Sequence, residues 1–274
     1  MPKFAANLSM MFNEIPFLAR FAAAATAGFT GVEYLFPYEF RAELIAAELK
    51  ENALENVLFN LPPGDWASGE RGTTCLPGRE EEFRVGLATA IRYAKELNTT
   101  RLHAMAGIVP QGVSLADAKA TFIANLTFAA AELAKHGISL LIEAINTRDM
   151  PGFFLNTQAQ AYDILQEVGA KNLMLQMDLY HMQIMEGDLA VKLSKYAPQC
   201  GHVQVAGVPK RNEPNAGEVH YPFLYDHLDA IGYSGWIGCE YRPAGDTSDG
   251  LGWFKQMLAL DRVRTIPISR ATTI

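Results

Sequence analysis

The sequence contains few cysteines, and none are spaced as a CxxC pair. Cys75, Cys200 and Cys239 are the three cysteines among 274 residues, an odd number at wide spacing. This usage is typical of reduced thiols in a cytoplasm and argues against a disulfide-stapled secreted domain. A structural zinc site built from cysteine pairs is disfavoured for the same reason.

Long apolar runs and concentrated positive charge are also missing. The sequence has no stretch of about 18 apolar residues, and Asn7, Asn13 and Glu14 interrupt its N-terminal segment, so we expect neither a membrane span nor a secretory signal. The 23 basic and 30 acidic residues give a net charge of −7, and no basic run is present. Phosphate binding needs concentrated positive charge. We therefore expect a soluble cytoplasmic protein whose partner is neither a nucleic acid nor a membrane.

Short apolar segments alternate with amphipathic stretches along the whole chain. We expect strands within residues 3–12, 31–37, 55–62, 101–107, 138–146, 172–182, 201–207 and 236–243. We expect helices within residues 15–28, 41–53, 78–98, 115–136, 157–168, 187–197, 221–232 and 250–263. Strands that are apolar on both faces and alternate with helices indicate a parallel sheet. Eight such units are the number that closes a (β/α)8 TIM barrel of the α/β class.

No shift in composition marks a second domain, so we expect residues 1–274 to form a single TIM-barrel domain. An open doubly wound sheet is the alternative, but neither GxGxxG nor GxxxxGK[ST] follows the first strand, which removes its usual nucleotide-binding versions. Two long loops, 62–78 and 207–220, follow the third and seventh strands. In a barrel they would lie on the C-terminal face, where active sites of this fold are found.

Polar residues stand near the carboxyl ends of the four later strands. Glu143 interrupts the apolar segment ISLLIEAIN, and Asp178, His181, Gln204 and Glu240 each follow a run of mainly apolar residues. In a closed barrel the inward-pointing ends of neighbouring strands converge on one axis. We therefore expect these side chains to share one pocket.

Three carboxylates in one buried pocket repel one another by several kcal/mol, even at an effective dielectric constant of about 20. A proton or a divalent cation removes that repulsion. The ligand set predicted at these strand ends comprises Glu143, Asp178, Gln204 and Glu240. Oxygen ligands of this kind suit Mg²⁺ or Mn²⁺.

Each of these residues also has a simpler structural interpretation when it is taken alone. Glu240 has a neighbouring arginine, Arg242, with which it could pair, and Gln204 could be a hydrogen-bonded core amide. Asp178 could cap a helix, and His181 could be a satisfied core histidine. The occurrence of an oxygen donor at four consecutive strand ends favours a shared site over four separate structural roles.

These residues lie in segments that resemble the hydroxypyruvate isomerase family, part of the wider xylose isomerase-like barrel group that includes ketose 3-epimerases. The resemblance rests on FAANLSMMF, GVEYLFPYEF, FNLPPGDWASGERGTTCLPGREEEFR, LLIEAIN, PGFFL, LQMDLYHMQIMEGDL, GHVQVAGVPKRNEPNAGEV, GWIGCEYRP and GLGW. It covers nearly the full length of the chain. It implies a (β/α)8 barrel, the fold that the alternation predicts independently.

The resemblance also implies roles for individual residues. Glu143 and Glu240 match the two glutamates that bind a divalent metal and act as the acid–base pair, and Asp178 matches a further metal ligand. His181 and Arg211 match residues that contact the substrate. The epimerases carry a histidine as the ligand on the seventh strand, whereas this chain has Gln204, as in the hydroxypyruvate isomerase branch. A neutral amide binds a transition metal less tightly than imidazole does.

The implied reaction interconverts hydroxypyruvate and tartronate semialdehyde through an enediolate, with a small hydroxy- or keto-acid as the partner. The two glutamates exchange the proton, and Arg211 engages the substrate carboxylate unless it is a solvated loop charge. Alternatives are a 2-oxo-tetronate isomerase or related epimerase, a phosphate-ester nuclease of the endonuclease IV kind, and a barrel that only binds sugar acids. Six histidines that mostly miss the strand ends, together with the acidic charge, disfavour the nuclease.

Two further hypotheses concern the loop after the third strand and the C-terminus. The segment GDWASGERGTTC contains Trp66 and Arg71 among glycines and is a candidate lid over the pocket. Exclusion of water by a lid would protect an enediolate. The C-terminal segment RTIPISRATTI could contact another subunit of a homo-oligomer or fray.

Overall fold

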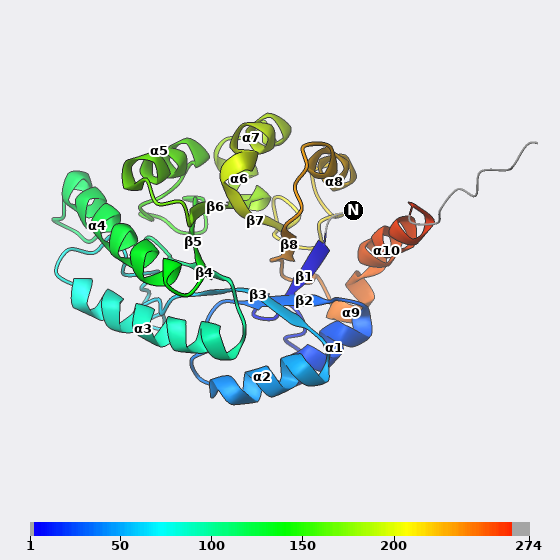
Figure 1. The fold of residues 1–274 in the computed structure, drawn as a ribbon. Coiled ribbons are helices and arrows are strands. Elements are labelled where there is room, and N and C mark those ends of the chain that lie inside the picture. Colours follow the sequence, from blue (N-terminus) through cyan, green and yellow to red (C-terminus); the bar gives the residue numbers. More distant parts are fainter. Residues whose placement is uncertain (1–2, 265–274) are drawn as a thin grey trace, which may run out of the picture.

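A computed structural model describes residues 3–264 and shows eight parallel strands closed into a barrel (Figure 1). The strands are β1 (Lys3–Asn7), β2 (Gly31–Tyr34), β3 (Glu55–Asn60), β4 (Arg101–His103), β5 (Ser139–Glu143), β6 (Leu173–Asp178), β7 (Cys200–Val205) and β8 (Trp236–Cys239). Each strand pairs with the next in sequence, and β8 pairs with β1. The predicted (β/α)8 fold is confirmed, and the open sheet is wrong because the barrel closes.

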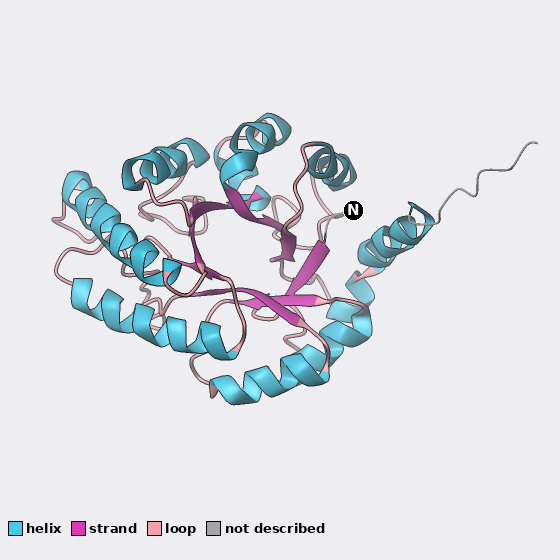
Figure 2. Cartoon of the chain, in the orientation of Figure 1, coloured by secondary structure: helices cyan, strands magenta, loops and turns pink. Residues whose placement is uncertain are grey.

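Helices form a ring outside the barrel (Figure 2). They are α1 (Ala19–Ala27), α2 (Ala42–Glu51), α3 (Glu80–Glu96), α4 (Leu115–Ala134), α5 (Gln158–Val168), α6 (Leu179–Met185), α7 (Leu189–Tyr196), the 3₁₀ turn η1 (Ala197–Gln199), α8 (Tyr221–Ala230), α9 (Thr247–Gly250) and α10 (Gly252–Arg264). Side-chain caps begin α4 and α5: Ser114 accepts a hydrogen bond from the amide of Asp117, and Thr157 accepts one from the amide of Gln160. Across residues 3–264, no helix has the length and apolarity needed to cross a membrane.

The segment 172–182 differs from its predicted single strand. β6 ends at Asp178, and Leu179–Met185 form α6. The Asp178 carboxylate accepts a hydrogen bond from the amide of Tyr180 and so caps this helix. The run from Leu179 is apolar because α6 is buried, and short buried helices and strands have similar composition. The predicted capping role of Asp178 is therefore confirmed.

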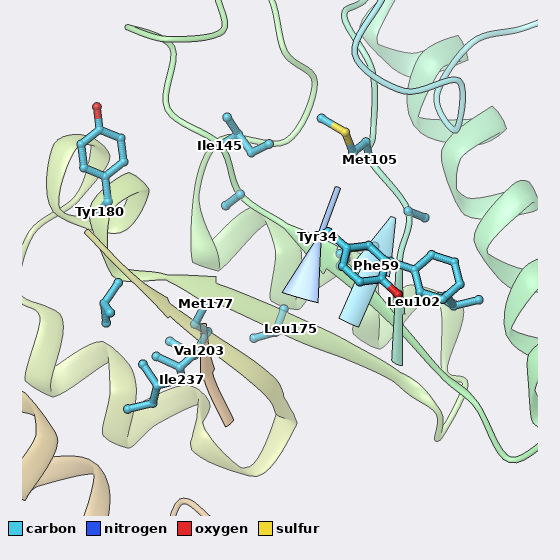
Figure 3. Packing of buried hydrophobic residues seen from close by; sticks show 14 of the residues in the cluster. Tyr34, Phe59, Leu102, Met105, Ile145, Leu175, Met177, Tyr180, Val203 and Ile237 are labelled. Carbon is cyan, nitrogen blue, oxygen red and sulfur yellow. The ribbon is translucent and has the colours of Figure 1, made fainter. Parts of the chain in front are cut away.

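Apolar side chains fill two separate regions. The larger core lies between the barrel and the helices and includes Tyr34, Phe59, Leu102, Leu175 and Val203 (Figure 3). The smaller cluster comprises Ala5, Val57, Leu58, Leu141 and Trp236. Because side chains alternate between the two faces of a strand, Ala5, Leu141 and Trp236 share the inward face with Asn7, Glu143 and Glu240. The smaller cluster therefore forms an apolar floor beneath a polar upper barrel.

The C-terminal segment proposed as a subunit contact falls mostly on residues 265–274, which lie outside the described residues. The oligomeric state stays a prediction.

Candidate active site

Four buried side chains converge at the carboxyl ends of β5, β6 and β8. Glu143 and Asp178 are the last residues of β5 and β6, Glu240 directly follows β8, and His181 lies in the first turn of α6. Each offers a ligand atom, and these atoms lie within 4.8 Å of one another. All four residues are at most 5% exposed. The predicted carboxylates therefore share one pocket, as the strand-end pattern indicates.

Arg211 supplies positive charge to this cluster. Its Nη2 donates hydrogen bonds to Oε2 of Glu240 at 2.6 Å and to Oδ2 of Asp178 at 3.3 Å. Its guanidinium also lies 4.9 Å from the centroid of the Tyr180 ring. Glu240 thus pairs with Arg211 from the loop after β7, whereas the sequence suggested Arg242 as a neighbouring partner.

The backbone of Arg211 is held in the left-handed region, with φ 58°. Its amide donates to the carbonyl of Gly207, and its own carbonyl accepts from the amide of Arg242, both at 2.7 Å. A left-handed conformation is uncommon for a residue with a long side chain and persists where surrounding contacts determine it. The two backbone bonds hold the residue in place, and its side chain reaches the acidic cluster.

Burial and mutual repulsion shift the protonation of the carboxyl groups. Burial raises the pKa of Glu143 well above its ordinary value, and the charges of Glu240 and Asp178 raise it further. Burial also raises the pKa of Glu240 to about 8, although Arg211 opposes the shift. Burial raises the pKa of Asp178 as well, again against Arg211. One guanidinium does not compensate three ionised carboxylates, so the cluster favours a proton or a further cation.

The histidine of the cluster is neutral and presents a defined tautomer. Burial, followed by the charge of Arg211, lowers the pKa of His181 well below its ordinary value. The backbone amide of Asn146 donates to Nδ1 of His181 at 3.4 Å. A neutral ring that accepts at Nδ1 carries its proton on Nε2. That nitrogen lies 3.5 Å from Asp178 and 3.7 Å from Glu143, so it faces the pocket as a donor.

Gln204 lies in the layer just below the cluster, on β7. Its Oε1 accepts a hydrogen bond from Gln176 at 2.6 Å, and its Nε2 donates to Glu33 at 2.8 Å. The predicted role as a core amide is confirmed by these bonds, while its role as a metal ligand stays a prediction.

Sequence reasoning did not identify two buried residues at this site, Glu33 and His103. His103 Nδ1 lies 3.7 Å from Oε2 of Glu143 and 3.3 Å from the side-chain oxygen of Asn60. Burial lowers the pKa of His103 to about 3, so this ring is neutral. Glu33 interrupts the buried strand GVEY just as Glu143 interrupts its own, and that same signal could have identified it.

A cavity of about 460 Å³ opens above the cluster. Glu143, His181, Arg211 and Glu240 line its base; other lining residues include Ser9, Asn13, Glu14, Leu35, Asn60, Trp66, His103, Met105, Ile145, Met150 and Arg242. The volume lies in the range of about 300–1,000 Å³ that is usual for small-molecule sites. Trp66 brings the long loop after β3 to the cavity, and the Arg71 guanidinium lies 3.9 Å from the centroid of its ring.

The residues of the cluster fit a divalent cation. Oε1 of Glu143 is buried and has no hydrogen-bond partner among the described residues, although it lies next to three other potential ligands. An unpaired buried carboxylate oxygen is costly unless a cation or proton satisfies it. The cluster therefore has the donor set, the charge and the free oxygen that a metal ion requires.

Comparison with known proteins shows the family to which this chain belongs. The family model of the xylose isomerase-like TIM barrel matches residues 21–257. A protein named 2-oxo-tetronate isomerase from Cupriavidus necator is 55% identical over 258 residues, which are 94% of this chain and 99% of that protein. A protein named hydroxypyruvate isomerase from Escherichia coli is 49% identical over 92% of this chain and 98% of its own length.

A solved structure agrees closely in fold. The crystal structure described as an AP endonuclease of family 2 from Brucella melitensis has a TM-score of 0.92 and 52% sequence identity, and the match covers 93% of this chain and 99% of that chain. By its family match and its relatives, the chain belongs to the xylose isomerase-like TIM-barrel family and, within it, to the hydroxypyruvate isomerase family. The predicted resemblance is confirmed, and the chain is an isomerase.

Proposed function

We propose that this enzyme interconverts hydroxypyruvate and tartronate semialdehyde by moving one proton between neighbouring carbons. The observation that supports the proposal is the approach of the Glu143 and Glu240 carboxylates, from β5 and β8, to within 4.8 Å in one buried pocket. Two groups so placed can act on adjacent carbons of one small substrate. One glutamate in its ionised form removes the C3 proton, and the other in its acid form delivers a proton to C2. The hydroxyl proton moves from the C3 oxygen to the C2 oxygen at the enediolate stage, so that C3 becomes the aldehyde and C2 the alcohol.

The raised pKa values of both glutamates suit this exchange. A general base or acid is most effective when its pKa lies near the working pH. Burial moves the pKa of Glu240 to about 8, so both protonation states of this group are accessible near neutrality, and burial raises the pKa of Glu143 as well. Positioned acid–base groups contribute about 10²–10⁴-fold each to rate.

The developing enediolate oxygens need stabilisation. The neutral His181 presents Nε2–H to the pocket and can donate to one substrate oxygen. Arg211 can engage the substrate carboxylate with two parallel hydrogen bonds, which a planar guanidinium allows. Glu143, Asp178 and Glu240, with Gln204 from the layer below, would hold Mg²⁺ or Mn²⁺, which supplies Lewis-acid stabilisation of the same negative charge when bound.

The substrate carboxylate and Glu240 share a partner. Arg211 is bonded to Glu240, so its engagement with a substrate carboxylate weakens that pair. Release from Arg211 raises the proton affinity of Glu240, because the opposing charge is withdrawn. Binding of the acid thus favours the protonated form of the glutamate that then serves as the proton donor.

A four-carbon 2-oxo-tetronate is the second candidate substrate. It undergoes the same proton transfer, with a hydroxymethyl group in place of one hydrogen at C3. The cavity of about 460 Å³ leaves room for this group, and the C. necator relative carries that name. The nuclease alternative is disfavoured, because the cluster contains one histidine and three carboxylates instead of several histidines.

A substrate panel tests the proposal. Formation of tartronate semialdehyde from hydroxypyruvate, and isomerisation of 2-oxo-tetronate and of C5 and C6 ketoses, are followed with and without a chelator. We expect turnover of a three- or four-carbon acid that falls when the chelator is added. Absence of turnover with every C3–C6 substrate would overturn the proposal.

A further inference from the structure

A further buried acid, Glu33, lies beneath the proposed acid–base pair. It is hydrogen-bonded to polar side chains of the upper barrel. Glu33, on β2, is 1% exposed. Its Oε1 accepts hydrogen bonds from Nδ2 of Asn7 at 2.9 Å and from Nε2 of Gln204 at 2.8 Å. Its Oε2 lies 2.6 Å from Nε2 of His202. Glu33 is therefore a buried carboxylate with three polar partners from β1 and β7.

Two chains of amide groups connect Glu33 to the two glutamates. On one side, Nδ2 of Asn7 lies 3.4 Å from Oε1 of Glu240. On the other side, the oxygen of Gln204 accepts from Gln176, whose Nε2 also donates to Oε2 of Glu143 at 3.1 Å. One acid is thus linked to both members of the pair, through one amide to Glu240 and through two amides to Glu143.

The chemistry of a carboxylate decides the direction of these hydrogen bonds. A carboxylate oxygen accepts hydrogen bonds, whereas a primary amide presents either its NH₂ group or its oxygen. Oε1 of Glu33 accepts from both Asn7 and Gln204, so both amides turn their NH₂ groups toward it. The oxygen of Gln204 then faces Gln176, which turns its own NH₂ group toward that oxygen and toward Glu143. A neutral residue at position 33 would leave both orientations open.

The backbone is adapted to this network at its two ends. The register between β2 and β3 shifts at Val32–Glu33, and the register between β6 and β7 shifts at Leu175–Gln176. Such irregularities re-aim side chains and are common beside active sites. Opposite Glu33, Gly238 provides space, since a Cβ at that position would overlap the Glu33 carboxylate.

We propose that Glu33 is a positioning residue for the isomerisation. It fixes the orientation of the Asn7, Gln204 and Gln176 amides, so that an N–H group holds each of the two glutamates in place. The same orientation leaves the Gln204 oxygen directed away from Glu33, on the side of the ligand cluster. This inference rests on the proposed function for the reaction, while the orientation of the amides is a property of the protein alone.

Glu33→Gln is the direct test, because it keeps size, removes the negative charge and replaces one acceptor oxygen with an NH₂ donor. We expect kcat to fall about 10–100-fold, the usual effect of losing a supporting hydrogen bond, with KM changed by less than about threefold. Asn56→Ala is the matched control. Asn56 is similarly buried and its side chain is bonded to Tyr34 and Thr99, with no hydrogen bond to the network among residues 3–264. The control should lose stability and keep kcat.

A double-mutant cycle with Gln176→Leu shows whether Glu33 acts through the amide chain. We expect the effect of Glu33→Gln on kcat to be smaller in the Gln176→Leu background, because that change already removes the hydrogen bonds from Gln176 to Gln204 and Glu143. A kcat of Glu33→Gln within about twofold of the wild type in a folded protein, or full additivity of the two changes, would overturn the proposal.

Side-chain amide NMR signals separate this inference from the proposed function. The NH₂ signals of Gln176 and Gln204 should shift in Glu33→Gln and remain in place in Asn56→Ala, whatever substrate the enzyme uses. Unchanged signals would overturn the positioning role even if the isomerase activity is found. Shifted signals with no turnover in the wild type would refute the proposed reaction and retain the orienting role.

Discussion

Nη2 of Arg211 lies 2.6 Å from Oε2 of Glu240, so the residue predicted to bind substrate is paired with a residue predicted to transfer the proton. A pair of this kind couples substrate binding to the protonation of Glu240. It also means that removal of the charge at either position alters the charge of the whole cluster.

Arg211→Lys tests the role of this guanidinium. We expect KM for the acid substrate to rise at least about tenfold, because an ammonium is a point charge and cannot form two parallel hydrogen bonds. The charge of the cluster is conserved, so the melting temperature should change little. Steady-state kinetics measure the first effect, and thermal unfolding measures the second. An unchanged KM would assign Arg211 to a purely structural ion pair.

Glu143→Gln tests the acid–base pair. An amide cannot accept or deliver the proton, so we expect kcat to fall about 10²–10⁴-fold. The fold should persist, since the change removes a buried carboxyl group whose ionisation is already opposed by burial. Far-UV circular dichroism and thermal unfolding provide the structural control. Retained turnover would contradict the mechanism, and a wild type without turnover would favour the sugar-acid-binding barrel.

The stability of the metal-free protein should fall as pH rises from 6.5 to 8.5. The pKa of Glu240 is about 8 in the folded state, so over this range the folded protein holds a proton that the unfolded chain has released. The free energy of unfolding that this proton contributes is lost as pH rises through the folded-state pKa of Glu240. The lowered pKa values of His103 and His181 act mainly below pH 6.5; just above it they oppose the fall weakly, because unfolded histidines with a pKa of about 6.5 are still losing protons there.

Melting temperatures in the presence of a chelator measure this slope. Mn²⁺ should reduce it, because a cation replaces the proton and binds more tightly as the carboxyl groups ionise. Glu240→Gln is the control and should flatten the slope without metal. A melting temperature that rises with pH over this range would contradict the predicted protonation.

Limited proteolysis tests the loop after β3 as a lid. Arg71 donates a hydrogen bond to the carbonyl of Trp66 and stacks on its ring, and Trp66 lines the cavity. If substrate closes this loop, trypsin cleavage at Arg71 should slow when substrate is added. Cleavage at Lys171, an exposed residue before β6 that does not line the cavity, provides an internal reference. Equal cleavage with and without substrate would reject the lid.

The sequence predicts the barrel and the carboxylates of its site for one physical reason. Parallel strands are apolar on both faces, so Glu143 and Asp178 are conspicuous where they interrupt or end such runs. Glu33 carries the same signal in GVEY, but a strand of four residues makes it less distinct. The helix α6 resembled strand because its residues are mainly apolar.

Pairings across the barrel cannot be predicted from one sequence. The contact of Arg211 with Glu240 depends on the left-handed backbone at Arg211 and on two backbone hydrogen bonds, one to Gly207 in its own loop and one from Arg242 in the loop after β8. The orientation of Gln204 depends on Glu33, which is 171 residues away. These side chains meet only when the barrel closes. The sequence pattern predicts that the strands form a barrel, but it does not predict which side chains then come into contact.

The absence of a side chain at Gly238 has a consequence for related proteins. A Cβ there would occupy the space of the Glu33 carboxylate, so the two positions cannot change independently. A homologue with alanine or a larger residue at the equivalent of 238 should carry a shorter side chain at the equivalent of 33. Glycine on the eighth strand thus becomes a marker that distinguishes barrels with this internal acid from those without it.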